Sequence, residues 1–157
     1  MQKIGPCLWF DGKAEEAANF YTSIFKNSRI IDTTRYLEGS HQPEGSVMTV
    51  RFVLDGEEFL ALNGGPQFTF SPAISFYVIC EMQEEVDDLW EKLTAGGEGV
   101  QCGWLKDKFG VSWQIVPRSL MAMLSDADTA ASQRAVAAML QMKKLDISLL
   151  ERAFKNG

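Results

Sequence analysis

Two stretches of the chain, residues 1–66 and 73–118, carry the same order of secondary-structure patterns. In each stretch a short apolar strand pattern precedes an amphipathic helical pattern, and three further strand patterns follow. Helices are predicted over residues 13–25 and 83–94, where apolar residues recur at three- and four-residue steps. A repeated order of elements restricts the fold more strongly than any single element. We therefore expect an α+β protein built from two βαβββ modules.

The strand patterns are runs rich in β-branched and aromatic residues. In the first module they cover residues 4–10, 28–36, 46–54 and 57–63. In the second module they cover residues 73–81, about 100–102, 104–106 and 111–117. Asp55-Gly56, between the last two patterns of the first module, is typical of a two-residue hairpin turn.

Residues 119–157 differ from both modules because they are rich in Ala, Met and Leu. This composition predicts one or two amphipathic helices, which we expect to add a helical layer or to contact another subunit. A helix lying on a membrane surface is the alternative. It is disfavoured because the polar face is not strongly basic.

Charge and cysteine content exclude several classes of protein. The formal net charge is −6 and no Lys/Arg cluster is present, whereas nucleic-acid binding needs a basic face. The three cysteines are odd in number and far apart, which fits a reducing cytoplasm better than a disulfide framework. The start, MQKIGPCLWFDG, lacks a secretory apolar stretch, and no apolar run approaches the roughly 20 residues that span a bilayer. We expect a cytoplasmic protein with no nucleic-acid or membrane partner.

Three stretches together resemble the PhnB-like branch of the vicinal-oxygen-chelate superfamily, which includes glyoxalases, bleomycin-resistance proteins and dioxygenases. They read PCLWFDGKAEEAANFYTSIF, LDGEEFLALNGGPQFTFSPAISF and GGEGVQCGWLKDKFGVSWQIVP. The branch often carries the label 3-demethylubiquinone-9 3-methyltransferase. The resemblance implies a curled, partly open eight-stranded mixed sheet around a cavity, with helices on its outer face. It also implies a homodimer, and leaves open whether cavities form within one chain or between two.

Metal-dependent relatives place a ligand on the first and last strand of each module. When the two repeats are aligned, these places fall on Pro6 or Cys7, Leu60, Ser75 and Gln114. A leucine cannot bind a metal, and proline offers only its carbonyl. Serine and glutamine are weak neutral ligands for a divalent cation. The resemblance therefore implies a site without a metal, and no other cofactor is expected.

Without a metal, the cavity would act through its shape and a few polar groups. Strand alternation puts Gln114 on the same face as Ser112 and Val116, opposite Trp113 and Ile115. If Gln114 points inward, Ser75, Tyr77, Leu60 and Leu62 line the same space. Alternatively, Gln114 and Ser75 bond only to a neighbouring strand or to water.

Three further residues are candidates with two interpretations each. Arg51 either points inward, where it could bind a carboxylate or phosphate, or is a surface charge on an edge strand. His41 lies in a polar loop and is either an acid–base catalyst or a solvated loop residue. Trp104 either forms an aromatic wall of the cavity or packs in the core.

The sequence favours a metal-free protein that binds a small organic molecule. The alternative is a metal-independent enzyme that acts on a small carbonyl or enolate substrate through His41 or Arg51. A methyltransferase is the third reading. It finds no support in the residues, because no G-x-G loop that could bind adenosylmethionine follows a strand.

Overall fold

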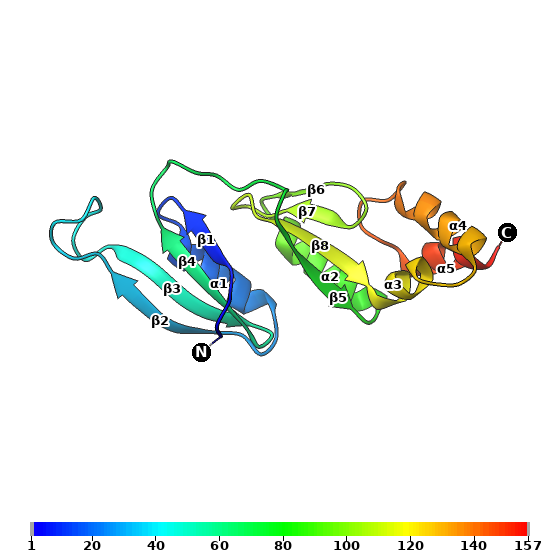
Figure 1. Cartoon of the computed structure of the whole chain (residues 1–157), viewed down its shortest axis with the longest axis horizontal. Helices are drawn as coiled ribbons and strands as arrows, with labels where there is room; N and C mark the ends of the chain where they lie inside the picture. The colour runs from blue at the N-terminus through cyan, green and yellow to red at the C-terminus, as the bar shows by residue number, and fades with distance from the viewer. Residues whose placement is uncertain (1, 157) are drawn as a thin grey trace. The chain divides into compact units, whose positions relative to one another are not determined.

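The computed structural model describes residues 2–156 and divides the chain into two compact units, the first ending at Phe70 and the second beginning at Ser71. Among the described residues there are eight strands, which form two four-stranded mixed sheets, one in each unit (Figure 1). The α+β class and the two βαβββ modules are confirmed. The eight strands expected in one curled sheet lie in these two sheets.

The first unit contains five elements, whose order matches the prediction. They are β1 (Cys7–Phe10), α1 (Ala14–Ile24), β2 (Arg29–Arg35), β3 (Val47–Leu54) and β4 (Glu57–Asn63). The sheet order is β1-β4-β3-β2, with β1 parallel to β4 and the other pairs antiparallel.

Helix α1 lies across one face of this sheet and contacts β3 and β4 (Figure 1). Its small residues Ala14, Ala17 and Ala18 are buried, so the helix approaches the strands closely. The ring of Tyr21 stacks on Phe52 of β3, with 6.2 Å between centroids. These contacts form the apolar core of the first unit.

The turn between β3 and β4 has the backbone that its sequence predicts. Asp55 and Gly56 both have positive φ, 46° and 85°, as a type I′ hairpin turn requires. Leu54 then pairs with Glu57, which sets the register of the two strands. This register decides which residues of β3 and β4 share a face.

The second unit repeats the order and then continues into helices. Its elements are β5 (Ser75–Cys80), α2 (Gln83–Thr94), β6 (Glu98–Gly99), β7 (Trp104–Lys106), β8 (Ser112–Pro117), α3 (Arg118–Leu124), α4 (Thr129–Met139) and α5 (Ile147–Lys155). The sheet order is β5-β8-β7-β6, which mirrors that of the first sheet.

The prediction of a strand over residues 100–102 is wrong. The short strand β6 ends at Gly99, and the following residues form a turn in which Trp104 N donates to the carbonyl of Gln101 at 3.0 Å. Cys102 and Gly103 both have positive φ, 57° and 85°, which an extended strand does not allow.

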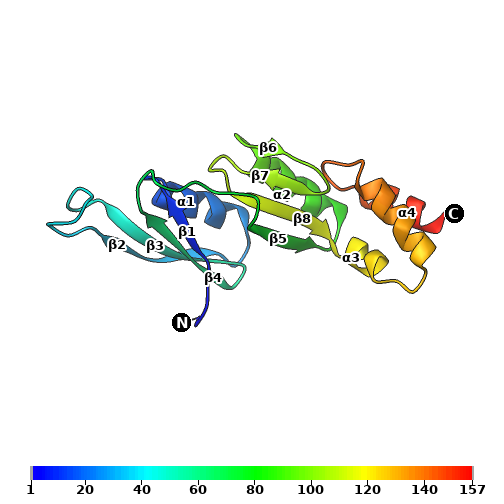
Figure 2. The ribbon, with the colours of Figure 1, turned by 45° about the horizontal axis from the view of Figure 1, so that its top comes forward.

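The C-terminal segment forms three helices rather than the one or two predicted. Two of them, α3 and α4, are labelled in Figure 2. The breaks occur where Asp128 and Asp146 accept hydrogen bonds from the backbone nitrogens of Ala131 and Leu149 and so cap α4 and α5. The three helices share a buried apolar cluster, formed by Leu120, Met123, Ala135, Leu145 and Leu150. None of the helices within residues 2–156 is both long enough and apolar enough to cross a membrane.

Candidate functional site

The two faces of the first sheet differ in burial. In β4, Phe59, Ala61 and Asn63 are buried, whereas Leu60 and Leu62 are partly buried. Since successive strand residues point to opposite faces, the buried set lies under α1. Leu60 and Leu62 therefore lie on the face that α1 leaves uncovered, which we call the open face of the first sheet.

The second sheet shows the same contrast. In β8, Trp113 and Ile115 are buried, while Gln114 and Val116 are partly buried. The alternation thus places Gln114 and Val116 on the face opposite the core, which we call the open face of the second sheet. Ser112 belongs to this face by register, yet its exposed fraction is only 3%.

Strand pairing shows which side chains are neighbours at the positions where metal-dependent relatives place their ligands, on the first and last strand of each module. In the first unit Cys7 pairs directly with Leu60 across the parallel strands β1 and β4. Pro6, the alternative first place, contributes its backbone carbonyl, which accepts a hydrogen bond from Leu60 N at 3.0 Å. Cys7 is therefore the side chain that shares the open face with Leu60.

In the second unit the two predicted places are joined by a hydrogen bond. The amide nitrogen Nε2 of Gln114 donates to Oγ of Ser75 at 2.9 Å. Tyr77 is the direct register partner of Gln114, and its exposed fraction is 68%. The open face of the second sheet thus carries a connected amide–hydroxyl pair beside an exposed phenol.

These residues do not fit a divalent metal ion. Leu60 has no donor atom. Cys7 is exposed, but the loss of part of its hydration raises the pKa of its thiol, which disfavours the thiolate that binds metals. Gln114 and Ser75 are neutral donors already bonded to each other. No group of three or more His, Cys, Asp or Glu residues within positions 2–156 is arranged to hold a metal.

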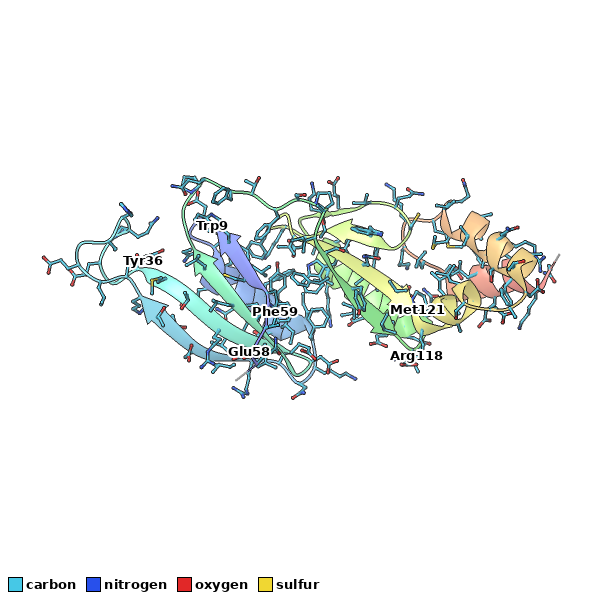
Figure 3. The ribbon with its side chains drawn as sticks, viewed as in Figure 1. Trp9, Tyr36, Glu58, Phe59, Arg118 and Met121 are labelled. Carbon is cyan, nitrogen blue, oxygen red and sulfur yellow. The ribbon has the colours of Figure 1, made fainter. Side chains whose placement is uncertain are left out.

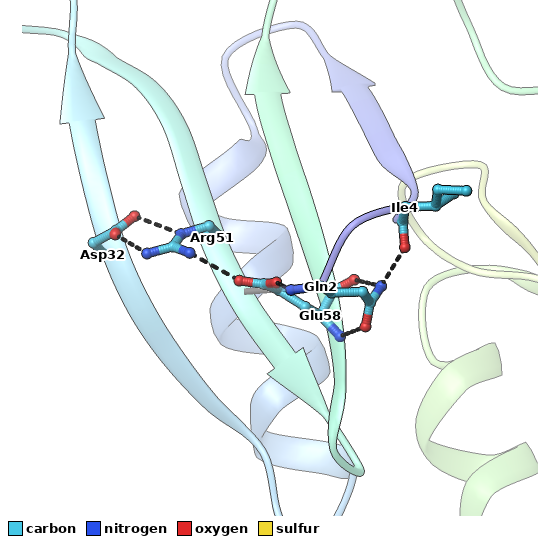
Figure 4. A network of polar contacts seen from close by, with 5 residues as sticks. All are labelled: Gln2, Ile4, Asp32, Arg51 and Glu58. Atoms are coloured by element: carbon cyan, nitrogen blue, oxygen red, sulfur yellow. Dashed lines mark hydrogen bonds and ion pairs between the residues drawn. The ribbon is translucent and has the colours of Figure 1, made fainter.

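Arg51 lies on the open face of the first sheet, opposite Leu60 in the register. The prediction that β3 is an edge strand is wrong, because β3 lies between β4 and β2. Its guanidinium contacts two carboxylates from the flanking strands (Figure 4). Nη2 and Nε donate to Asp32 at 2.5 and 3.3 Å, and Nη1 donates to Glu58 Oε1 at 2.9 Å.

The Arg51 network is electrostatically satisfied without a ligand. The hydrogen bonds from Arg51 hold the pKa of the Asp32 carboxyl below its usual value, so Asp32 is charged at neutral pH. The second oxygen of Glu58 accepts from Gln2 N at 3.0 Å. One cation faces two anions, and an incoming carboxylate or phosphate would have to displace one of them. Arg51 is therefore not a free anion-binding group.

A shallow pocket of about 180 Å³ opens beside this network, and we call it the amino-terminal pocket. Glu58 and Phe59 are adjacent on β4 in Figure 3. The pocket's lining comes from the residues before β1, from β1 itself and from β3 and β4: Gln2, Gly5, Pro6, Cys7, Arg51, Glu58, Phe59 and Leu60. It includes the Cys7 and Leu60 places together with the paired Arg51.

A larger pocket of about 410 Å³ lies within the second unit, around the β6–β7 hairpin, and we call it the hairpin pocket. Its lining is mainly apolar: Pro72, Glu98, Val100, Gln101, Cys102, Trp104, Leu105, Lys106 and Ser112. Trp104 pairs with Gln114 in the ladder and so belongs to the open face of the second sheet. Gln114 and Ser75 are not part of this lining.

His41 is exposed in the connection between β2 and β3. Within the described residues it has no hydrogen-bond partner that would fix its ring or its tautomer. A general base needs such an orienting group and a nearby reacting atom. A catalytic role for His41 stays a prediction, and no contact of this ring supports it.

Sequence reasoning missed two buried polar residues that organise the structure. The side chain of Asn63 accepts a hydrogen bond from Ala14 N and donates one to the carbonyl of Val47. Its backbone carbonyl accepts from the hydroxyl of Tyr36, which is labelled in Figure 3. Asp107 accepts from the backbone nitrogens of Phe109 and Val111 and from the Trp113 indole. An Asn at a strand end and an Asp-x-x-Gly turn were the available signals.

The family model described as 3-demethylubiquinone-9 3-methyltransferase matches residues 2–116. The chain is 44% identical to the PhnB protein of Bacillus cereus, whose description carries the same methyltransferase name. That similarity covers 74% of this chain and 99% of the other, with a TM-score of 0.68. The family match ends before α3, so the C-terminal helices lie outside it.

Two more distant structures share the fold. A protein of Pseudomonas aeruginosa is 20% identical over 74% of this chain and 98% of the other, with a TM-score of 0.61. The fosfomycin resistance protein FosX of Listeria monocytogenes, solved with Mn(II) and sulfate, is 18% identical over 73% and 92%, with a TM-score of 0.51. The comparison with curated proteins finds no match.

Proposed function

Because the chain belongs to the 3-demethylubiquinone-9 3-methyltransferase family, the PhnB-like branch of the vicinal-oxygen-chelate superfamily, we propose that it binds a small organic molecule without a metal ion. One observation carries this proposal. The register places Cys7 beside Leu60, and Tyr77 beside Gln114, on faces that the helices of the modules leave uncovered. These side chains offer apolar surface and neutral hydrogen-bonding groups rather than a set of metal ligands.

The polar groups of the two faces suit recognition rather than bond breaking. The Gln114–Ser75 pair can exchange its mutual hydrogen bond for bonds to a ligand, since both groups are donors and acceptors. Leu60 and Trp104 supply apolar and aromatic contact area. This division, with a few polar groups on an apolar surface, is typical of small-molecule sites.

The test is a screen of small organic fragments against the EDTA-treated protein. Binding is detected by shifts of the backbone and side-chain amide resonances in NMR spectra. The proposal predicts that neutral organic fragments shift the resonances of Leu60, Ser75 and the Gln114 side chain without added metal. Gln114→Leu should weaken binding, whereas Gln133→Leu, at an exposed position of α4, should not. Fragments that shift these resonances only after a divalent cation is added would contradict the proposal.

The methyltransferase name of the family is not proposed as an activity. Adenosylmethionine sites of the Rossmann type rely on a glycine-rich loop between a strand and a helix, where backbone N–H groups approach the cofactor. Here Asp11-Gly12-Lys13 precedes α1 and Glu81-Met82 precedes α2. Calorimetric titration with adenosylmethionine should give no binding heat, and a saturable signal would revive methyl transfer.

A homodimer in the cytoplasm is part of the same proposal. Phe68 and Ile74, on the segment between β4 and β5, are 65% and 76% exposed, which leaves apolar side chains available to a second copy. The free thiols Cys7, Cys80 and Cys102 fit a reducing compartment. Light scattering coupled to size-exclusion chromatography should give twice the chain mass of 17.5 kDa, and a value of one chain mass would contradict the dimer.

A further inference from the structure

We propose that the hairpin pocket of the second unit binds a small uncharged aromatic molecule carrying a hydrogen-bond acceptor such as a ketone oxygen, and that the C-terminal segment holds the wall of this pocket in place. The inference rests on the proposed small-molecule function and names both a place and a ligand class for it. All residues that line the pocket belong to the second unit.

The size of the pocket and its apolar lining set the scale of the ligand. About 410 Å³ lies within the range of roughly 300–1,000 Å³ that is typical of sites for small organic ligands. Pro72, Val100 and Trp104 give it a mainly apolar surface. An aromatic ring can stack on an indole and gain more than its buried area alone provides.

The charges at the pocket cancel, which favours an uncharged ligand. The two charged residues of the lining, Lys106 and Glu98, are paired across β6 and β7 with 4.0 Å between Nζ and Oε1. A carboxylate ligand would compete with Glu98 for Lys106, and an ammonium ligand would compete with Lys106 for Glu98. Either would also lose hydration on entering an apolar lining.

The indole N–H of Trp104 provides a hydrogen-bond donor. The Trp9 indole donates to the carbonyl of Gly65 and the Trp113 indole donates to Asp107, each at 2.9 Å. Trp104 has no such acceptor within residues 2–156, and its nitrogen is not a buried unsatisfied atom. Its N–H therefore reaches solvent and can donate to a ligand oxygen.

The C-terminal segment fixes the turn that carries this wall. Between α4 and α5, the carbonyls of Met142 and Lys143 accept from the backbone nitrogens of Cys102 and Gly103 at 2.8 and 2.7 Å. The side chain of Gln101 donates to the carbonyl of Leu140, immediately after α4, at 2.9 Å. Cys102 has the positive φ that non-glycine residues rarely adopt, so these bonds stabilise a turn with an unfavourable backbone.

Three probes of similar shape and different chemistry test the ligand class. Acetophenone is neutral and has an acceptor, ethylbenzene is neutral without one, and benzoate is anionic. Each is titrated into the full chain while NMR follows the amides of Gln101 and Gly103 and the Trp104 indole. We expect acetophenone to shift these resonances at the lowest concentration, ethylbenzene to bind several-fold more weakly, and benzoate to leave them unchanged.

Two variants separate the donor from the wall. Trp104→Phe keeps an aromatic ring but removes the N–H, and should weaken acetophenone roughly fivefold, the effect of one hydrogen bond, without changing ethylbenzene as much. Trp9→Phe, in the first unit and outside the pocket lining, is the matched control. Bound acetophenone should also slow hydrogen exchange at the amides of Cys102 and Gly103, because it favours the closed turn.

Equal binding of benzoate, an unchanged acetophenone affinity in Trp104→Phe, or shifts confined to other parts of the chain would overturn the inference. Unchanged exchange at Cys102 and Gly103 would overturn the role of the C-terminal segment. If other fragments shift Leu60 and Gln114 while acetophenone leaves the hairpin pocket untouched, this inference fails and the proposed function stands. If no organic fragment binds anywhere, both fail.

Discussion

The side-chain oxygen of Asn63 accepts a hydrogen bond from the backbone nitrogen of Ala14 at 2.9 Å, so the last residue of β4 fixes the first turn of α1. The amide nitrogen of the same side chain donates to the carbonyl of Val47 at 3.0 Å. Because Asn63 is 8% exposed, both bonds lie out of reach of most solvent. A single side chain thereby ties the helix to two strands of the first unit.

Asn63→Ala should lower the free energy of unfolding by about 2–3 kcal/mol, since it leaves a buried donor and a buried acceptor without partners. Asn63→Asp keeps the oxygen that caps α1 and loses the bond to Val47. Urea unfolding of both variants is the measurement. A loss below about 0.5 kcal/mol for Asn63→Ala would show that water replaces these bonds at little cost.

Arg51→Met should destabilise the chain most near neutral pH. Arg51 holds the pKa of Asp32 below its usual value, so the Asp32 contribution is present above about pH 4, the ordinary carboxyl pKa, and is lost as the pH falls through the lower folded value. The difference in urea midpoint between wild type and variant should therefore be largest at pH 6–8 and shrink in acid. Lys13→Met, which breaks the exposed pair with Glu16, is the control and should change the midpoint little. A difference independent of pH would exclude the carboxylate network as its cause.

Gly103→Ala should destabilise more than Gly110→Ala. Both glycines have positive φ, 85° and 90°, so both substitutions introduce roughly 1–2 kcal/mol of backbone strain. A β-carbon on Gly103 would also lie 2.9 Å from Cδ1 of Leu145 and 3.0 Å from the carbonyl oxygen of Ile115, while one on Gly110 meets nothing within 4 Å. The difference between the two losses of unfolding free energy measures the combined cost of the contacts with Leu145 and Ile115. Equal losses would mean that Leu145 does not pack on this turn in solution.

Cys80 should be unreactive toward alkylating reagents in the folded protein. Cys80 is buried, and burial together with Glu85 and Glu81 raises the pKa of its thiol to about 12. Its thiolate is therefore scarce at pH 8, and iodoacetamide should leave Cys80 unmodified in the folded protein. Peptide mass spectrometry before and after urea denaturation measures this, with the denatured sample as the control. Labelling of Cys80 at equal rates in both samples would show that the second unit opens readily.

Local periodicity predicted much of the fold. The helix predicted over residues 83–94 has those bounds, and α1 differs from its prediction by one residue at each end, because apolar residues at three- and four-residue steps require no tertiary information. The prediction placed strand β6 too far along the chain. Its two residues, Glu98 and Gly99, are neither β-branched nor aromatic, whereas the next residue, Val100, is β-branched. The third C-terminal helix was missed because that prediction rested on composition, which does not locate helix ends such as the N-cap Asp128 that separates α3 from α4.

The candidate site divides in the same way. The orientation of Gln114 follows from alternation within one strand, and its bond to Ser75 joins the two places that the repeat alignment selected in the second module. The pairing of Arg51 with two carboxylates could not be predicted in this way. Asp32 and Glu58 come from different strands, and they reach Arg51 only because of the strand register and the register shift between β2 and β3. The spacing of residues in the sequence does not give the register or the shift.

Titration of the EDTA-treated protein with Mn²⁺, followed by NMR, tests the metal-free account most directly, because this paramagnetic ion broadens the resonances of nuclei close to it. If the open faces bind no metal ion, the Gln114 side-chain amide and the backbone amides of Cys7, Leu60 and Ser75 should keep their line widths at ion concentrations equal to that of the protein. Selective broadening of these resonances, reversed by EDTA, would show that the open faces hold a cation and would contradict it.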